Sequence, residues 1–163
     1  MTLPPIVQRL HDLVLAAAGR LAWLPPLVVR LAVGVLFLRT GWGKLGNLEG
    51  VTEYFASLHI PTPHANAILA ASTEFLGGIA LVAGLLTRLV SLPLIVTMIV
   101  AIITAKWADV ESLNGFLGLE EFLLILLLGW LAVAGAGAVS LDRVLERRLG
   151  FTPRDAPPVG SAR

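Results

Sequence analysis

The chain has 163 residues, of which 56% are hydrophobic and 14% charged, and its formal net charge is +1. Soluble domains carry about 25% charged residues, so the apolar surface of this chain exceeds what a water-facing exterior covers. The near-neutral charge gives no electrostatic basis for binding nucleic acid. The chain has no cysteine, which excludes thiol–disulfide exchange and thiolate metal ligation by its own side chains.

The segment before the first long apolar run predicts an amphipathic helix at the membrane interface. Within residues 1–24, Arg9 and Asp12 interrupt the stretch where the apolar core of a cleavable signal peptide would lie. Over residues 5–23 the apolar side chains recur at helical spacing, and the charged ones fall elsewhere on the wheel. A loosely ordered cytoplasmic tail is the alternative.

Four apolar segments follow, each with roughly the 20 residues that cross about 30 Å of hydrocarbon. Lipid offers the backbone no hydrogen-bond partners, so each segment is expected to be helical. The predicted spans are Leu27–Lys44, Ala65–Leu86, Leu89–Lys106 and Glu120–Val139, with a short helix near Gly50–Leu58 between the first two. The predicted fold class is therefore all-α, a polytopic membrane protein built as a bundle of four transmembrane helices.

After the fourth span, Ser140 is expected to cap a short cytoplasmic helix over Leu141–Leu149. The residues beyond it are rich in Pro, Gly and Arg, a composition that predicts disorder. We therefore divide the chain into an interfacial segment (1–24), a transmembrane domain (25–149) and a disordered tail (150–163).

The distribution of cationic residues predicts the orientation in the membrane. The side opposite the termini carries only Lys44 and Lys106, with Arg39 somewhat inside the first span. The side that holds both termini and the turn after the second span carries the other arginines: Arg9, Arg20, Arg30, Arg88, Arg143, Arg147, Arg148, Arg154 and Arg163. Cytoplasmic flanks are the positive ones, so we expect both termini in the cytoplasm.

One face of the first span carries a stripe of candidate site residues. Arg30, Gly34, Phe37, Gly41 and Lys44 are spaced by four, three, four and three residues, which places them on one side of a helix. The two glycines allow a neighbouring helix to approach closely. The alternative is that both cations only extend to the lipid headgroups.

Glu74 lies about nine residues into the second predicted span, on the order of 13 Å below the outer surface. An ionisable side chain in hydrocarbon costs roughly 2.5–3.5 kcal/mol unless it meets a partner or water, so Glu74 needs a proton or a cation. Lys44 lies on the glycine-bearing face of the first span. Arg39 matches Glu74 in depth but lies about 180° around the helix from Arg30, off the glycine-bearing face. The choice between them stays open, as does a purely structural role for Glu74.

The fourth span begins with Glu120 and Glu121, where glutamates favour the positive end of the helix dipole. Glu121 shares a face with apolar residues, so its side chain can also point into the helix bundle. His59 and His64 in an outer loop match no metal motif, and we predict no metal site. Several charged residues fall in the outer half of the bundle, which predicts a polar pocket open to the periplasmic side: Lys44, Arg39, Glu74, Lys106, Glu120 and Glu121. The candidate site residues are Arg30, Arg39, Lys44, Glu74 and Glu121.

Three motifs in order along the chain carry a family resemblance. The first span has Arg30, Gly34, Phe37, Gly41, Lys44 and Leu45; the second span and its exit have Glu74, Gly77, Gly78, Gly84, Thr87 and Arg88; the end has Gly135, Gly137, Ser140, Leu141 and Asp142. Over about residues 30–145 this pattern resembles the DoxX family of small bacterial membrane proteins. Arg39 departs from the pattern, which often has a neutral residue or a histidine there.

The resemblance implies a four-helix bundle in the bacterial inner membrane and an association with quinone- or thiol-linked redox systems. We expect an accessory, non-catalytic membrane subunit that holds a quinone or a partner enzyme, with lipids, other redox-complex subunits or a second copy as partners. Glu74 would be the proton-active or hydrogen-bonding group, kept charged by Lys44 or Arg39. The alternatives are a small-molecule transporter or binding protein and a purely structural membrane scaffold.

Overall fold

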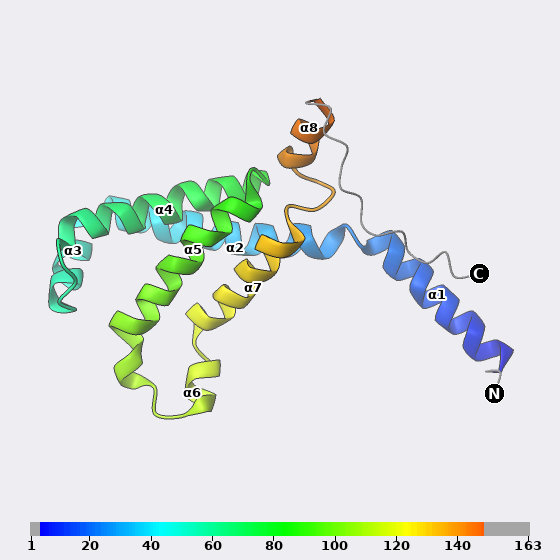
Figure 1. The fold of residues 1–163 in the computed structure, drawn as a ribbon, viewed down its shortest axis with the longest axis horizontal. Coiled ribbons are helices and arrows are strands. Elements are labelled where there is room, and N and C mark those ends of the chain that lie inside the picture. The colour runs from blue at the N-terminus through cyan, green and yellow to red at the C-terminus, as the bar shows by residue number, and fades with distance from the viewer. Residues whose placement is uncertain (1–3, 149–163) are drawn as a thin grey trace.

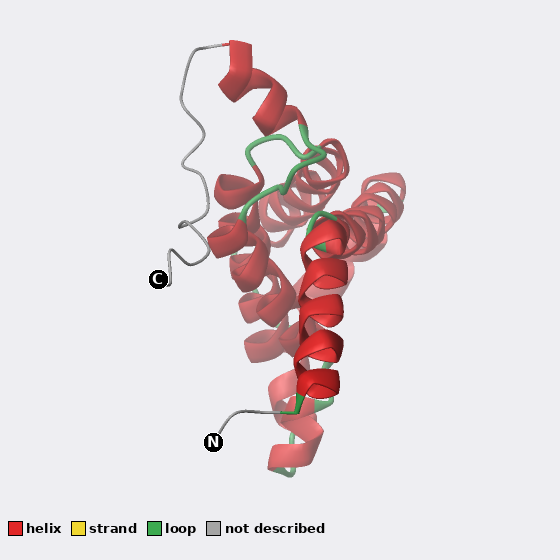
Figure 2. Ribbon diagram, turned by 90° about the vertical axis from the view of Figure 1, so that its right-hand side faces the viewer, coloured by secondary structure: helices red, strands yellow, loops and turns green. Residues whose placement is uncertain are grey.

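The computed structural model describes residues 4–148, and all regular structure within that range is helical (Figures 1 and 2). The predicted all-α class is therefore confirmed, whereas the predicted disordered tail lies outside the described residues. In chain order the elements are α1 (Pro5–Leu21), α2 (Leu24–Gly46), α3 (Leu48–Ser57), α4 (Pro63–Ala83), α5 (Thr87–Ala101), the π-helix η1 (Ile102–Lys106), the 3₁₀ turn η2 (Trp107–Asp109), α6 (Leu113–Leu117), α7 (Glu120–Ala134) and α8 (Leu141–Arg148).

Three helical segments of the described chain are long and apolar enough to cross a membrane. They are Leu24–Gly46, Pro63–Ala83 and Thr87–Lys106, the last combining α5 with η1. At about 1.5 Å per residue, each covers the roughly 30 Å of a hydrocarbon core. They correspond to the first three predicted spans, with ends shifted by a few residues.

Helix α7 is apolar but shorter than the fourth predicted span. It contains 15 residues and ends at Ala134, so the predicted continuation to Val139 is wrong. Gly135 and Gly137 follow with φ of +82° and +80°, values that a right-handed helix does not contain. At about 22 Å, α7 by itself falls short of the hydrocarbon thickness.

Helices α2 and α4 run antiparallel in close contact, and glycines make that contact possible (Figure 1). A Cβ atom at Gly41 would overlap the backbone of Phe75, and one at Gly78 would overlap the backbone of Leu38. The predicted face of the first span is confirmed, because its arginine, phenylalanine and two glycines are all buried in α2. Close backbone approach of this kind is how small residues join helices in lipid, where apolar burial gives little driving force.

Four helices share one apolar core. Its buried members are Val33 and Phe37 from α2, Leu81 from α4, Leu94 and Met98 from α5, and Leu124, Leu128 and Leu131 from α7. Helix α7 packs mainly against α5, to which it is joined through η1, η2 and α6. The short α7 is therefore an integral part of the bundle.

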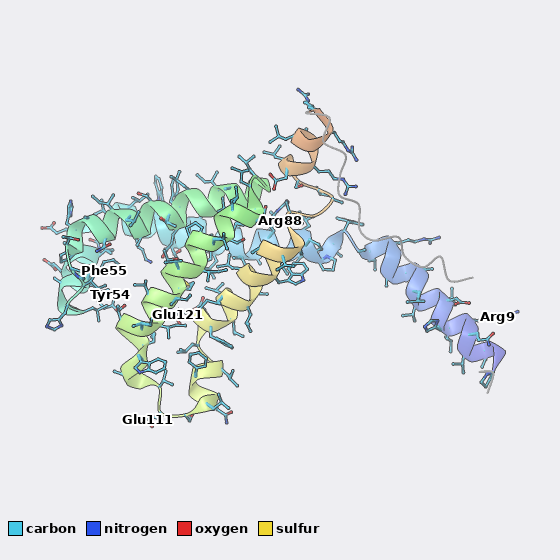
Figure 3. All side chains as sticks on the ribbon, in the orientation of Figure 1. Arg9, Tyr54, Phe55, Arg88, Glu111 and Glu121 are labelled. Carbon is cyan, nitrogen blue, oxygen red and sulfur yellow. The ribbon has the colours of Figure 1, made fainter. Side chains whose placement is uncertain are left out.

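Helix α1 extends away from the bundle (Figures 1 and 3). It forms over almost the range predicted for an amphipathic helix. Its apolar side chains are exposed, with Ile6 at 69%, Leu13 at 67% and Val14 at 65% of their full accessibility. Nothing within residues 4–148 covers this apolar surface, which therefore stays free for another apolar phase.

The start of α8 is joined to the turn between α4 and α5. The Asp142 carboxylate accepts hydrogen bonds from the N–H groups of Leu86 at 2.6 Å and Thr87 at 3.2 Å. The Asp142 N–H in turn donates to the Gly84 carbonyl at 3.0 Å. The predicted cap is also present, because Ser140 Oγ accepts from the N–H of Arg143 at 3.3 Å. Asp142 thus caps the first turn of α5 from a distant part of the chain.

Candidate functional site

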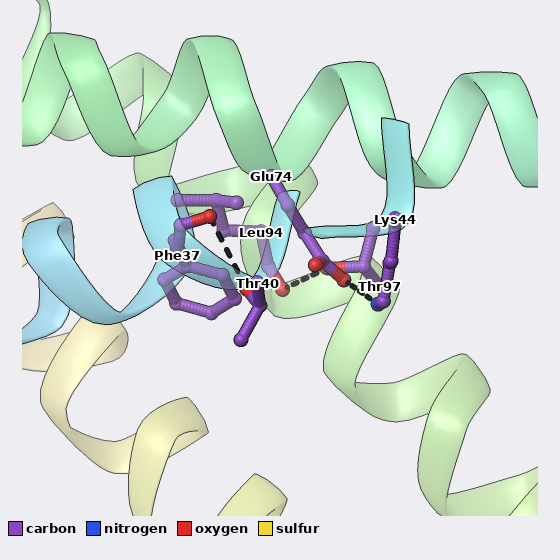
Figure 4. A network of polar contacts seen from close by, with 6 residues as sticks. All are labelled: Phe37, Thr40, Lys44, Glu74, Leu94 and Thr97. Atoms are coloured by element: carbon purple, nitrogen blue, oxygen red, sulfur yellow. Dashed lines mark hydrogen bonds and ion pairs between the residues drawn. The ribbon is translucent and has the colours of Figure 1, made fainter. Parts of the chain in front are cut away.

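A partly buried ion pair joins the two helices that pack most closely. Lys44 Nζ on α2 donates to Glu74 Oε1 on α4 at 2.5 Å (Figure 4). Gly41 lies one turn before Lys44 and brings the α2 backbone against residues 74 and 75 of α4. That close approach lets the lysine side chain reach the carboxylate. Of the two cations considered for Glu74, the structure pairs it with Lys44.

The Glu74 carboxylate is only half satisfied. Its Oε2 is buried and has no hydrogen-bond partner among the described residues. Figure 4 draws Thr40 of α2 and Thr97 of α5 in the same polar network. Both hydroxyls already donate to carbonyls of their own helices, Thr40 to Phe37 at 3.2 Å and Thr97 to Leu94 at 2.8 Å. Neither hydroxyl donates to Oε2, which therefore has no donor among the described residues.

The two partners of the ion pair differ in their access to the surroundings. The Glu74 side chain keeps 3% of its full accessibility, whereas the Lys44 side chain keeps 33%. A lysine ammonium has three N–H donors, and Glu74 accepts one of them. The lysine is therefore the accessible end of the pair, and a molecule that reaches it would meet free N–H donors beside a buried carboxylate.

The structure does not bring all five predicted pocket residues together. Arg39 is exposed on α2 and has no hydrogen bond or ion pair within the described part of the chain. Glu121 lies half-buried in the first turn of α7 (Figure 3). Arg30 is buried about 21 Å along α2 from Lys44, and its Nη1 donates to the Ala136 carbonyl at 2.8 Å. Lys44 and Glu74 alone form the centre of the candidate site.

Two members of the network, Thr40 and Thr97, were not among the predicted site residues. Thr40 precedes Lys44 by four residues, and this spacing places it on the same side of α2. Thr97 lies on α5, whose position beside α4 follows only from the fold. A threonine in an apolar helix also satisfies its hydroxyl on its own backbone, so its type alone does not indicate a site.

The two histidines of the outer loop are not part of this network. His64 Nδ1 lies 3.3 Å from the Thr52 hydroxyl, and His59 is exposed with a φ of +57°. Among the residues that the structure describes, no group of three or more His, Cys, Asp or Glu side chains could hold a metal ion.

Comparison with known proteins gives one family and several relatives. The DoxX family model matches residues 26–107, which include both residues of the ion pair. The Bacillus subtilis protein named "Putative oxidoreductase CatD" is 35% identical over 71% of this chain and 83% of its own length. The Escherichia coli inner membrane protein YqjF is 27% identical over 75% and 92%.

A third relative is a Mycobacterium tuberculosis membrane protein, Rv3486, which is 35% identical over 76% of this chain and 84% of its own length. No solved structure matches the chain.

Proposed function

This chain belongs to the DoxX family, and from that premise we propose that it is an accessory inner-membrane subunit of a redox system. In this proposal it holds a quinone headgroup at Lys44 and Glu74. The relatives support the compartment, since YqjF is named an inner membrane protein. They support the redox association through the word oxidoreductase in the name of CatD.

The observation that carries the proposal is the half-satisfied carboxylate. A buried polar atom without a partner costs about 1–3 kcal/mol, and more when the group is charged. A purely structural ion pair would be expected to satisfy both carboxylate oxygens. Glu74 instead keeps Oε1 on Lys44 and leaves Oε2 bare. This geometry suits a group that takes up a proton or meets a ligand.

The residues present fit a quinone headgroup. Its ring carbonyls accept hydrogen bonds, and the two remaining N–H groups of Lys44 can donate them. Oε2 of Glu74 can hold a proton next to the bound ring. A bound quinone supplies two-electron, two-proton chemistry, with electrons delivered by a partner oxidoreductase. The chain itself binds and orients the headgroup and holds a proton at Glu74.

We place α7 across the membrane as the fourth span and both termini in the cytoplasm. Three leucines of α7 belong to the same core as the three long helices, which supports a common depth. Residues 135–139 continue the chain past the end of α7 and add length on the cytoplasmic side. Helix α1 then lies in the interface with its exposed apolar side chains in lipid.

The test is Glu74→Gln in the purified full-length protein, with Glu53→Gln as the control. Glu53 is an exposed glutamate on α3, so the control removes the same charge away from the ion pair. We expect Glu74→Gln to weaken binding of a short-chain ubiquinone analogue by about tenfold or more, which corresponds to losing one charge-assisted interaction. Titration with the analogue and thermal unfolding are measured together.

The two readouts separate the alternatives. Weaker binding by Glu74→Gln but not by Glu53→Gln supports the proposal. Absence of binding by the wild-type protein, with a lower unfolding temperature for Glu74→Gln, would show a structural scaffold instead. Binding of the analogue that neither variant changes would place any quinone site elsewhere. Co-purification of a redox subunit with the native chain would support the accessory role over that of a transporter.

A further inference from the structure

A second polar site lies at the other end of the bundle, where α2, the end of α4 and α8 meet. It is a groove of about 450 Å³, a volume typical of small-ligand pockets. Its lining consists of Arg30, Ala83, Ala138, Val139, Ser140, Leu141, Arg143, Val144 and Arg147. The groove is about 21 Å along α2 from the Lys44–Glu74 pair and does not depend on the function proposed for that pair.

Three guanidinium groups line this groove, and two of them have unpaired donors. Arg30 is 3% exposed; its Nη1 is bonded to a carbonyl, but its Nε has no partner among the described residues. Arg143 is half-buried, and its Nε is likewise buried and without a partner there. Arg147 is exposed at the same groove. Buried guanidinium donors without acceptors are costly, and an anion in the groove would relieve that cost.

Among the side chains that the structure describes, Asp142 is the carboxylate whose charge acts on Arg30. No residue in the described lining of the groove is acidic. Asp142 lies nearby, but its two carboxylate oxygens already accept the N–H groups of Leu86 and Thr87. The Ser140 hydroxyl donates to the Gly137 carbonyl and accepts from the Arg143 N–H, so it is occupied as well. Within its described lining, the groove therefore presents positive charge and unpaired N–H donors without matching acceptors.

We propose that this groove binds a phosphate group through Arg30, Arg143 and Arg147. The planar fork of an arginine matches the oxygens of a phosphate, and three such forks favour a polyanionic group over a single carboxylate. The phosphate belongs to a phospholipid headgroup or to a soluble phosphate compound. Both sources present the same chemistry, and the experiment distinguishes them.

The test compares full-length wild-type protein with Arg147→Gln, the double variant Arg143→Gln/Arg147→Gln, and Arg148→Gln as the matched control. Arg148 is exposed on the same helix and does not line the groove, so Arg148→Gln removes the same charge outside the proposed site. Arg147 is also exposed, so its single variant leaves the packing of the fold unchanged. The probes are inorganic phosphate and short-chain phosphatidylglycerol, each titrated in detergent against thermal unfolding and, for the lipid, against retention in native mass spectrometry.

We expect the wild-type protein to bind one of the probes, Arg147→Gln to weaken that binding severalfold, and the double variant to weaken it about tenfold or more. Arg148→Gln should bind as the wild type does. Binding of phosphatidylglycerol alone identifies a lipid headgroup as the source, and binding of inorganic phosphate identifies a soluble one. The proposal fails if neither probe binds, or if Arg148→Gln weakens binding as much as the double variant does.

Discussion

At the scale of single residues, the central feature is a carboxylate with unequal oxygens. Oε1 of Glu74 is bonded to Lys44, while Oε2 is buried and has no hydrogen-bond partner among the described residues. The hydroxyls of Thr40 and Thr97 donate to carbonyls of their own helices. In the function proposed above, Oε2 is the atom that remains available to a ligand while Oε1 keeps its bond to Lys44.

The glycines of the α2–α4 contact allow a test at the same scale. We predict that Gly41→Ala destabilises the protein by about 1–3 kcal/mol, because the added Cβ overlaps backbone atoms of Phe75 and Glu74. Gly43→Ala is the control, since a Cβ there meets no atom within 4 Å. It should be neutral or stabilising by up to about 1 kcal/mol, as alanine is in a helix interior. The free energy of unfolding of both variants is measured in mixed detergent. Equal destabilisation by Gly41→Ala and Gly43→Ala would contradict the packing argument.

Sequence spacing predicts most of the ion pair but not its surroundings. The intervals of three and four residues place Lys44 and the glycines on one face, and the structure buries that face apart from the half-exposed Lys44. Depth alone favours Arg39 over Lys44 as the partner of Glu74, whereas the direction of each side chain around the helix favours Lys44. Arg30 is buried on the same face but lies at the other end of α2. Helical periodicity predicts on which side of a helix a residue lies, and it does not predict which residues meet at the same depth.

At the scale of elements, Asp142 links three segments that are far apart in the sequence. Its carboxylate caps α5, and its own N–H bonds the turn after α4. The chain at that turn is unusual, with Gly84 at φ +68° and Leu86 at φ +49°. A leucine in the left-handed region is strained, and the Asp142 bonds hold its N–H in place.

We predict that Asp142→Ala lowers stability by about 0.5–2 kcal/mol, the usual cost of losing a helix cap. The loss should be local at first, so amide hydrogen exchange at Leu86 and Thr87 should speed up before exchange in the core of α5 does. Asp12→Ala is the control, because Asp12 is an exposed residue of α1 whose side chain keeps 79% of its accessibility. Exchange at Leu86 that stays unchanged in Asp142→Ala would exclude the capping role.

Element boundaries show what sequence reasoning captures at this scale. Apolar length finds the three long helices within a few residues, because lipid demands a continuous helical backbone. The end of the fourth is missed, since the apolar pattern runs on to Val139 while Gly135 and Gly137 adopt positive φ. Ser140 is recognisable as the cap of α8 from its place in the sequence. A cap that acts on another helix, as Asp142 does, has no local signal.

At the scale of the whole molecule, the two polar sites lie at opposite ends of one bundle. Lys44 and Glu74 lie toward the α3 end, and the three arginines of the groove lie toward the α8 end. An apolar core shared by four helices separates them. In the proposed orientation the ion pair is nearer the periplasm and the arginine groove is nearer the cytoplasm, where anionic lipid headgroups and positive flanks coincide.

This orientation predicts where reporter fusions at the helix connections will be active. A reporter after His59, between α3 and α4, and one after Ser112, between η2 and α6, should both report the periplasm. A reporter at Leu86, between α4 and α5, and one at the C-terminus should report the cytoplasm. The C-terminal fusion is decisive for α7, whose 15 residues are short for a span. A periplasmic signal there, with the other three unchanged, would mean that α7 does not cross and that the arginine groove does not form on the cytoplasmic side.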